Sequence, residues 1–596
     1  MKIESYMMNI LSKKFESITR KMANVLVLTG RSGVLVSARD FSNAIVTSDV
    51  RLLASAEGLP VHVIGIEKLA GSMLEFFEDI APGDAFLHNS PYHGNTHHAD
   101  HTIIIPVFYN DEFQFAVLTK AHQADIGNCR PTTYTVFSKD IYEEGALNFP
   151  CIRIQRNYKD IKDLIRMIKM RIRVPDQWYG DYLGMVASAR TGEKELHELF
   201  TQYGVETIKS FVNQWFEYSE KRMINEIRKL PKITVEGEIR HDPVPGVMEE
   251  GIPIRAKIIV DPDEGYITID LTQNIECVKG GINLSESTAR SYPIIGIMNC
   301  LDCTIPHNSG SLSRIKVKLK ENCIVGIPKH PTCCSVATTN LGCRLVNLIQ
   351  RLFSKIDEKK GIAEGKTGQP ATQPVISGVD KRNGNNYINQ IHSLLGGGPA
   401  SYGHDGWVNY GNPTTAGLMH KNSVELNEQK YPIIYHEQSI IPDKVGYGEW
   451  NGSPAIKMVF EPRWSPMKVS YTGDSYKYPP KGILGGHDGS KTYIKKIDDK
   501  GKETRLPQLT DEVEIKPGEK VVAIDSSGGG YGDPLNRQPE RVLLDCQREF
   551  ITIETAKKIY GVVIEGFNPR EFKVDYEATN NLRRKKRKGI KTKRRK

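Results

Sequence analysis

The spacing of hydrophobic residues changes along the chain, and each change predicts a different kind of element. Apolar positions three and four residues apart predict helices at 1–27 and 66–80, whereas 33–47 reads as two strands around a turn. Two β-rich runs, HTIIIPVFY (101–109) and FQFAVLTKAH (113–122), flank the short turn YNDE and predict a β-hairpin. The first third of the chain is therefore predicted to mix helices with strands.

The pattern shifts twice more toward the C-terminus. Residues 159–230 are rich in charges and have the apolar spacing of amphipathic helices. From about residue 232, apolar residues recur at every second position, which favours strands. Gly and Pro clusters follow at 360–490, and a strand then leads into a glycine-rich loop and a final helical stretch. We predict a mixed α+β fold with an N-terminal region at 1–230, a β-rich middle region at 231–505, a C-terminal strand-loop-helix region at 506–575 and a disordered basic tail at 576–596.

Composition is that of an ordinary globular protein. The 596 residues are 39% apolar. No apolar run reaches the roughly 18 residues of a membrane span, and the N-terminus lacks the pattern of a signal peptide. We therefore expect a cytoplasmic protein with no membrane contact. Its ten cysteines are expected to be reduced thiols. The CxxC at 300–303 has no second CxxC that could complete a four-thiolate zinc site.

Positive charge is concentrated at the C-terminus. The net charge is +9, but the last fourteen residues, RRKKRKGIKTKRRK, contain eleven Lys or Arg and no acid, so the body is not basic. Such a run is typical of a disordered, solubilising appendage. Because no aromatic residue is interleaved with these charges, we do not expect nucleic acid as a partner. A non-enzymatic scaffold with an anion-binding tail remains an alternative.

Histidines and acids gather in NSPYHGNTHHADH (89–101), directly before the predicted hairpin. His97 and Asp100 lie three apart there, and His122 ends the second strand, which antiparallel pairing returns to the same edge. Asp40, in SARDFSNA, interrupts a segment whose apolar residues predict a strand, and it supplies another carboxylate. Two imidazoles and two carboxylates suit Zn²⁺ or Mn²⁺ better than a dedicated Mg²⁺ or Ca²⁺ cage. From the spacing alone, a histidine-rich surface loop is the alternative.

Several short motifs follow one another along the chain, and their combined order is far more specific than any one of them. They include SARDFSNAIV, PGDAFLHNSPYHGNTHHAD, KAHQADIG, EEGALNFP, GGINLSESTARSYP, IPHNSGSLSRIKV, NSVELNEQKYP and SSGGGYGDPLNRQPERVLLDC. Across roughly residues 25–565 the sequence resembles the hydantoinase B/oxoprolinase family. That family includes N-methylhydantoinase B subunits, 5-oxoprolinase, caprolactamase β subunits and acetone carboxylase α subunits.

The resemblance implies that the N-terminal region binds a metal through four ligands, which are Asp40, His97, Asp100 and His122. The implied ion, Zn or Mn, would lower the pKa of a bound water and orient it toward the substrate. Asp125 would steady the last ligand or accept a proton. His98 is a further catalytic candidate, although His98, His93 and His101 do not match ligand positions and are expected to line the pocket or face solvent. His62 matches a family position near the site, where either a catalytic histidine or a hydrogen-bonded core histidine is expected.

The resemblance further implies a partner. A cyclic amide is a poor electrophile, and phosphorylation of its oxygen by ATP would activate it. The chain has no P-loop, so ATP would be used by a separate hydantoinase A-type subunit in a hetero-oligomer. The expected reaction is hydrolysis of a cyclic amide. The alternative is carboxylation of a ketone, as in acetone-type carboxylases, whose α subunits are longer.

Two glycine-containing stretches bear on the substrate. SSGGGYGDP (526–534) is expected to be a tight structural turn rather than a phosphate site. The family usually carries an SGGxGxxRGG stretch, where this chain has IPDKVGYGEWNGSP (441–454). That departure leaves the class of substrate open.

Overall fold

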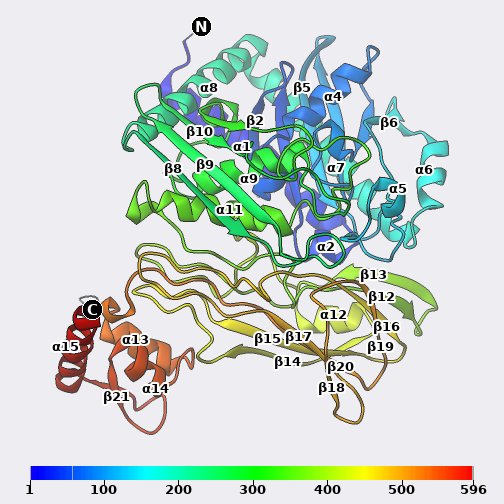
Figure 1. The fold of residues 1–596 in the computed structure, drawn as a ribbon. Coiled ribbons are helices and arrows are strands. Elements are labelled where there is room, and N and C mark those ends of the chain that lie inside the picture. The colour runs from blue at the N-terminus through cyan, green and yellow to red at the C-terminus, as the bar shows by residue number, and fades with distance from the viewer. Residues whose placement is uncertain (1, 57, 594–596) are drawn as a thin grey trace.

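The computed structural model describes residues 2–56 and 58–593. The N-terminal half of the chain, blue to green in Figure 1, forms an upper body that rests on a β-rich slab, and a small C-terminal unit lies at one end of the slab. The prediction of a mixed α+β fold is confirmed. Within the described ranges, every helix is too short or too polar to serve as a membrane span.

The upper body contains a seven-stranded antiparallel sheet in the order β2-β1-β5-β4-β3-β6-β7. The strands are β1 Phe41–Thr47, β2 Leu52–Ala56, β3 Ala85–His88, β4 Asp100–Tyr109, β5 Glu112–His122, β6 Ile152–Arg156 and β7 Lys159–Asp160. The accompanying helices are α1 Ser5–Thr29, α2 Gly33–Val36, α3 Pro60–Val63, α4 Glu67–Phe76, α5 Ile141–Glu144, α6 Lys162–Lys169, α7 Pro175–Tyr203 and α8 Val205–Ile227, with the 3-10 turn η1 Pro91–His93.

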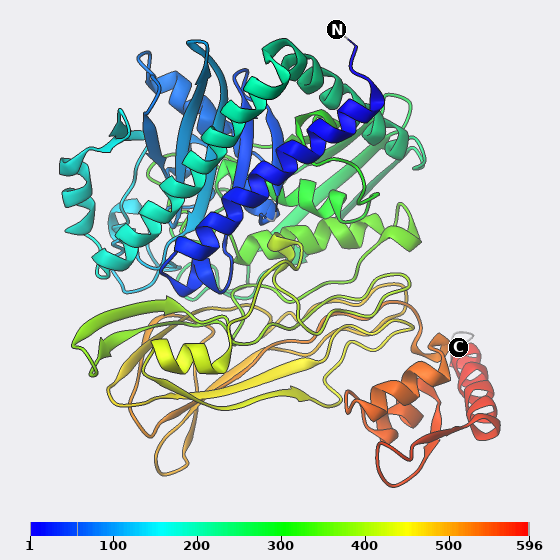
Figure 2. The same cartoon turned by 180° about the vertical axis from the view of Figure 1, so that it is seen from behind.

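Both faces of this sheet are covered, which explains why its central strands are continuously apolar. Side chains alternate along a strand, so Ile103 and Ile105 point to one face and Ile104 to the other. Ile103 and Ile105 join the core built with α1 and α7, whose long helices cross the back of the sheet in Figure 2. Ile104 packs in a separate cluster with Leu69 and Met73 of α4. A sheet buried on both sides needs no polar face.

The hairpin of β4 and β5 fixes the register of the sheet. Its turn residues Asn110 and Asp111 have φ values of 51° and 62°. Positive φ at both central positions gives the type I′ turn, whose twist matches that of paired strands. A bulge between Val107 and Phe108 then shifts the register by one residue, so that Asp100 pairs with His122 at the open end of the hairpin. Two predicted metal ligands are thus brought face to face by the strand pairing itself.

A second sheet completes the upper body in the order β11-β10-β9-β8. In β9 the burial alternates, and Ile254, Ile258 and Val260 join the core that includes Ile295 and Leu345 from two helices. The elements are β8 Ile233–Arg240, β9 Pro253–Asp261, β10 Tyr266–Asp270 and β11 Ile315–Lys318, with α9 Glu286–Met298, α10 Ser309–Leu312, α11 Asn340–Phe353 and η2 Glu358–Lys360.

The slab is built from two sheets, β13-β12-β16-β19 and β14-β15-β20-β17-β18. Ile376 and Val469 of the first meet Met458, Phe460 and Val521 of the second in one apolar core. The strands are β12 Val375–Asp380, β13 Asn385–Gln390, β14 Ile433–Ile441, β15 Ala455–Pro462, β16 Met467–Thr472, β17 Tyr493–Ile497, β18 Glu503–Arg505, β19 Leu509–Ile515 and β20 Lys520–Ile524, with η3 Pro413–Thr415 and α12 Val424–Lys430.

The C-terminal unit has its own small core, which includes Val542, Tyr560 and Val562. Its elements are η4 Pro534–Asn536, α13 Pro539–Gln547, α14 Ile553–Thr555, the π-turn η5 Ala556–Tyr560, β21 Val563–Glu565, β22 Lys573–Asp575 and α15 Tyr576–Lys593.

Three local expectations differ from the structure. Residues 33–36 form the short helix α2 rather than a strand, because Ser32 caps it by accepting a hydrogen bond from Leu35 N. The boundary near 505 does not separate two folding units, since β19 and β20 beyond it pair with β16, β15 and β17 before it. Residues 576–593 of the expected disordered tail form α15, which is anchored where Arg583 donates to the carbonyl oxygens of Tyr560 and Arg537.

Candidate metal centre

Three strand ends meet at one edge of the N-terminal sheet and carry the candidate ligands. Asp100 begins β4 and His122 ends β5, and the two are paired across the hairpin. Asp40 precedes β1, whose first residue Phe41 pairs with Ala121, and the carbonyl oxygen of Asp40 accepts a hydrogen bond from His122 N at 3.0 Å. The register of adjacent strands therefore delivers three polar residues to one place.

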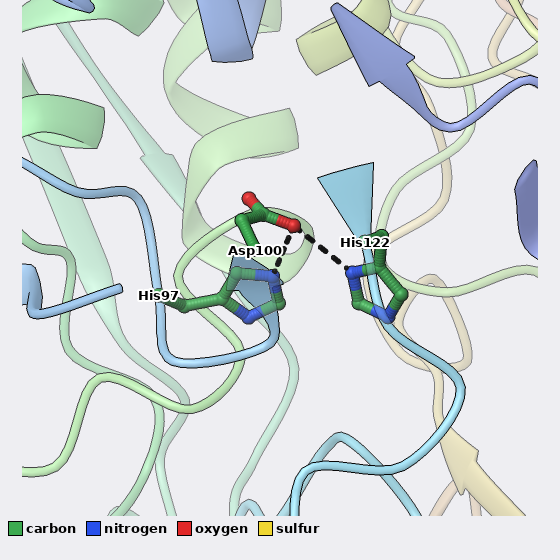
Figure 3. Close-up of side chains that lie close together, drawn as sticks. All are labelled: His97, Asp100 and His122. Carbon is green, nitrogen blue, oxygen red and sulfur yellow. Dashed lines mark hydrogen bonds and ion pairs between the residues drawn. The ribbon is translucent and has the colours of Figure 1, made fainter. Parts of the chain in front are cut away.

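His97, Asp100 and His122 form a compact triad (Figure 3). His97 Nε2 and His122 Nδ1 each lie 3.1 Å from the same oxygen, Oδ1 of Asp100. One ligand atom from each of the three lies within 4.8 Å of the other two, a spacing that a single ion can bridge. All three residues are buried. Buried polar groups at this spacing suit a metal site of mixed nitrogen and oxygen ligands.

The hydrogen bonds around the triad fix its orientation. His97 Nδ1 donates to the carbonyl oxygen of Ser335 at 2.8 Å, and His122 Nε2 lies 3.1 Å from the hydroxyl of Thr133. The Asn95 amide donates to the carbonyl oxygens of both His97 and Asp100 at 2.7 Å, which holds the connecting turn. Such outer contacts set the tautomer and angle of a ligand ring.

The donor set of the triad requires a cation. Because the Nδ1 hydrogen of His97 is given to a carbonyl oxygen, Nε2 of the neutral ring carries a lone pair, which faces a carboxylate oxygen. Two lone pairs at this distance need a proton or a metal ion between them. Burial lowers the pKa of His97, but the charge of Asp100 and its hydrogen bond outweigh burial and raise that pKa. Burial raises the pKa of Asp100, but the neighbouring imidazoles hold it well below its usual range. The residues fit a divalent ion.

Asp40 and His62 extend the site into a small hollow, here called the inner cavity. His62 Nε2 lies 3.2 Å from Asp100 Oδ2 and 3.6 Å from Asp40 Oδ1, so this ring joins the two carboxylates. The inner cavity has a volume of about 30 Å³. Beside these residues and His122 it is lined by polar side chains from distant parts of the chain: Tyr134, Thr338, Thr339, Gln390, Asn412, Thr414 and Thr415.

Two atoms around the inner cavity, His62 Nδ1 and Asn412 Oδ1, are buried without a hydrogen-bond partner in the described chain. The side chains of Thr338 and Gln390 lie beside the Tyr134 hydroxyl. Unsatisfied polar atoms are costly inside a protein, and two of them around one hollow indicate a place for water or ligand. Sequence patterns gave no signal for Thr338, Gln390 or Asn412, because each lies in a turn or strand end that resembles many others.

Two predicted catalytic residues point elsewhere. The Asp125 carboxylate accepts hydrogen bonds from Gly127 N and from Arg173, with which it forms an ion pair at 3.0 Å, and it makes no described contact with His122. Asp125 follows the end of β5, where the chain turns away from the sheet. His98 lies in the turn before β4, and its Nδ1 lies 3.0 Å from Glu144 Oε2, outside the inner cavity. The roles expected for Asp125 and His98 find no geometric support.

The other histidines of the cluster are also outside the inner cavity. His101 is buried against Phe149 and Trp178, and burial lowers its pKa to about 3. His93 is exposed and lies 3.1 Å from the Ser90 hydroxyl. Of the histidines in this stretch, the structure therefore brings only His97 into the triad.

The family model for hydantoinase B/oxoprolinase matches residues 4–534, which is most of the chain. The chain belongs to the hydantoinase B/oxoprolinase family. A caprolactamase subunit beta from Pseudomonas jessenii is 28% identical over 566 residues, covering 92% of this chain and 94% of that protein.

Two solved structures share the fold of this family member. The crystal structure of an ATP-dependent caprolactamase from Pseudomonas jessenii superposes with a TM-score of 0.88 at 24% identity, covering 98% of this chain and 100% of that chain. A nucleotide-free acetone carboxylase structure also gives a TM-score of 0.88, at 16% identity, and covers 99% of this chain and 84% of that chain. At these identities the two likenesses establish the fold alone.

The stretch that departs from the family pattern lies away from the inner cavity. Gly446 and Gly452 pack so closely on the loop at 526–530 that an added Cβ would come within 2.2 Å of Gly528 O. None of residues 441–454 lines the inner cavity. Gly528 itself packs on Gly398 O, where a Cβ would approach to 1.9 Å. Both glycine-rich stretches thus serve close backbone packing, which favours the structural interpretation of SSGGGYGDP.

Proposed function

We propose that this chain is the metal-dependent B-type subunit of an ATP-dependent cyclic amide hydrolase, and that it completes the hydrolysis of a substrate phosphorylated by a separate A-type subunit. The observation that carries the proposal is the triad of His97, Asp100 and His122, whose lone pairs converge beside a polar inner cavity. Zn²⁺ or Mn²⁺ bound there would act as a Lewis acid and lower the pKa of a coordinated water.

The protein's own residues have distinct parts in this proposal. His97, Asp100 and His122 hold the ion, and the carbonyl oxygen of Ser335 keeps the Nδ1 proton of His97 so that Nε2 remains a ligand. Asp40 lines the same cavity and supplies a further carboxylate. His62 lies between Asp40 and Asp100 and is placed to hold or move a proton between them.

The need for a partner rests on the chemistry of the substrate. Hydrolysis of an unactivated amide is slow because its carbonyl carbon is a weak electrophile, and phosphorylation turns the oxygen into a leaving group. The sequence carries no P-loop, and the relatives are named as a subunit beta and as an ATP-dependent enzyme. These facts support an A-type ATP-using subunit in a hetero-oligomer.

Elemental analysis tests the metal centre first. The wild-type chain is expected to hold about one Zn or Mn per chain after purification, and the variant His97→Ala/His122→Ala to hold almost none. The matched control is His93→Ala/His436→Ala, which removes two histidines outside the triad. Equal metal content in all three proteins would refute the assignment, and a wild type that stays metal-free after growth with both metals would favour the scaffold alternative.

Reconstitution tests the reaction. With its A-type partner, the chain is expected to open a cyclic amide only when ATP is present, and His122→Ala is expected to abolish turnover while the complex still assembles. The likeness to acetone carboxylase keeps ketone carboxylation as the second candidate. Incorporation of labelled bicarbonate into product, with no ring opening across a panel of lactams and hydantoins, would replace the hydrolase proposal with the carboxylase.

A further inference from the structure

A larger hollow, here called the outer cavity, adjoins the inner cavity. Its volume is about 540 Å³, which lies in the range of small-molecule sites. Leu59 and Met419 line both cavities, so these two side chains form a neck between them. The wall of the outer cavity also contains Arg39, Trp407 and His420.

The two volumes determine which part of a substrate each cavity can hold. A hollow of about 30 Å³ has room for one or two water molecules, and a five- to seven-membered ring is several times larger. Only the reacting end of a substrate can therefore reach the neck from outside. The ring and its substituents must occupy the outer cavity, whose side chains then decide which substrates are accepted.

The backbone ties the outer wall directly to the metal centre. Arg39 lines the outer cavity, and the next residue, Asp40, lines the inner one. Arg39 has φ 55°, a left-handed conformation that is uncommon for a residue with a side chain. His420 N donates to the carbonyl oxygen of Ala38 at 3.2 Å, which holds the opposite wall against this turn. A ligand bound by Arg39 is thus held one residue away from a candidate metal ligand.

The chemistry of the outer cavity selects an anion attached to a flat ring. Among the described residues that line it, Arg39 supplies a full positive charge and none is an Asp or Glu. The exposed Arg39 has no described ion-pair partner, so its guanidinium is available to a ligand. Trp407 is 59% exposed and presents an indole on which a planar amide ring can stack. Arg recognises carboxylate and phosphate alike through paired hydrogen bonds.

We propose that the outer cavity is the substrate-binding site and that Arg39 binds an anionic group of the substrate while Trp407 contacts its ring. This inference rests on the proposed function and names the class of substrate it acts on. The anion has two possible sources, a carboxylate on the ring or the phosphoryl group added by the partner.

Calorimetric binding to the isolated chain tests the site without catalysis. The probes are 2-pyrrolidone, its 5-carboxylate and inorganic phosphate, each titrated into the wild type and into Arg39→Gln. At least one anion is expected to bind the wild type and to lose about tenfold or more in affinity in Arg39→Gln, because a hydrogen bond to a charged group is lost. The matched control is Lys421→Gln, which removes an exposed charge beside His420 that does not line the cavity.

Turnover in the reconstituted complex separates the two sources. If Arg39 holds a ring carboxylate, Arg39→Gln raises KM for the acidic ring and leaves the neutral ring unchanged. If it holds the phosphoryl group, the variant impairs both rings alike, and phosphate binds the isolated chain. The proposal is overturned if no anion binds the wild type, or if Arg39→Gln behaves as Lys421→Gln does. Anion binding without any turnover would leave this site in place and count against the hydrolase instead.

Discussion

Two buried clusters in this protein each centre on an aspartate, but only one of them contains a cation that neutralises it. In the middle of the chain, Arg344 donates to both oxygens of Asp474, at 2.7 and 2.9 Å, and Asp242 N and Ser475 N complete that carboxylate. At the sheet edge, Asp100 is equally buried, but its neighbours are three imidazoles and a threonine hydroxyl, and no Arg or Lys of the described residues forms an ion pair with it.

This difference separates a buried carboxylate with a structural role from one with a functional role. The guanidinium neutralises Asp474 within the fold: burial raises the pKa of Asp474, but Arg344 and His241 outweigh burial and hold it well below the usual range. The Asp100 cluster must take its cation from outside, as a proton or a metal ion. A buried carboxylate without a built-in cation is therefore the better marker of function here.

Removing the central carboxylate of the candidate metal centre is expected to have the largest effect. In Asp100→Ala the two histidines lose the ligand between them, so bound metal should fall to near zero and turnover by about 1,000-fold or more. Elemental analysis and single-turnover kinetics of the complex provide the measurement. Asp163→Ala, at an exposed carboxylate, is the control. Retained metal in Asp100→Ala would contradict the comparison.

Removing Arg344 from the Asp474 cluster should lower the stability of the fold and leave the metal content unchanged. Arg344→Met leaves Asp474 buried without its guanidinium partner, which is expected to lower the free energy of unfolding by about 3–5 kcal/mol. Urea unfolding measures the change, and metal content should stay at the wild-type level in the folded fraction. The double variant Arg344→Met/Asp474→Leu should recover part of the loss. A single variant as stable as the wild type would show that the ion pair is not what completes this cluster.

Narrowing the neck should lower turnover and leave the bound metal in place. Met419 is nearly buried and lines both cavities, so Met419→Trp fills the passage to the metal centre. Turnover is expected to fall about 100-fold because the reacting atoms are displaced, with metal content unchanged. Met167→Trp, at a half-exposed methionine on α6, is the control. Unchanged turnover in Met419→Trp would place the substrate path elsewhere.

The parts of the site that follow from local rules were predictable, and the parts that follow from packing were not. The convergence of Asp100 and His122 could be predicted because two β-rich runs flank an Asn-Asp turn. Their direct pairing could not, since it depends on a bulge between Val107 and Phe108 that shifts the register by one residue. Asp125 could not be placed, since its position depends on Arg173, far along the chain. Gln390 and Asn412 reach the inner cavity only because the slab packs beneath the upper body. The short apolar run at 33–36 fits a strand or a helix equally, and only its cap decides.

The smallest expected effect concerns a third buried charge, Lys366. It is 2% exposed, and its Nζ has no hydrogen-bond partner in the described chain. Burial lowers the pKa of Lys366 to about 8, although nearby Asp525 acts in the opposite direction. In the unfolded chain a lysine titrates near pH 10.4, so between about pH 8 and 10.4 the unfolded state binds more protons than the folded state. Stability contributed by this site therefore rises with pH across that window, and the burial penalty is complete below it.

Lys366→Met removes the penalty together with the charge. Below about pH 8 the variant is expected to be more stable than the wild type by about 1–3 kcal/mol, and the difference should shrink as the pH rises toward 10. Urea unfolding at pH 7 and pH 9.5 measures both values, with Lys421→Met as the exposed control. A difference that does not vary with pH would mean that Lys366 keeps its proton by pairing within the fold, as Arg344 does. Lys366 would then resemble the Arg344–Asp474 cluster, in which the fold itself supplies the opposite charge. The metal centre would keep the distinction of a buried charge that the fold does not neutralise.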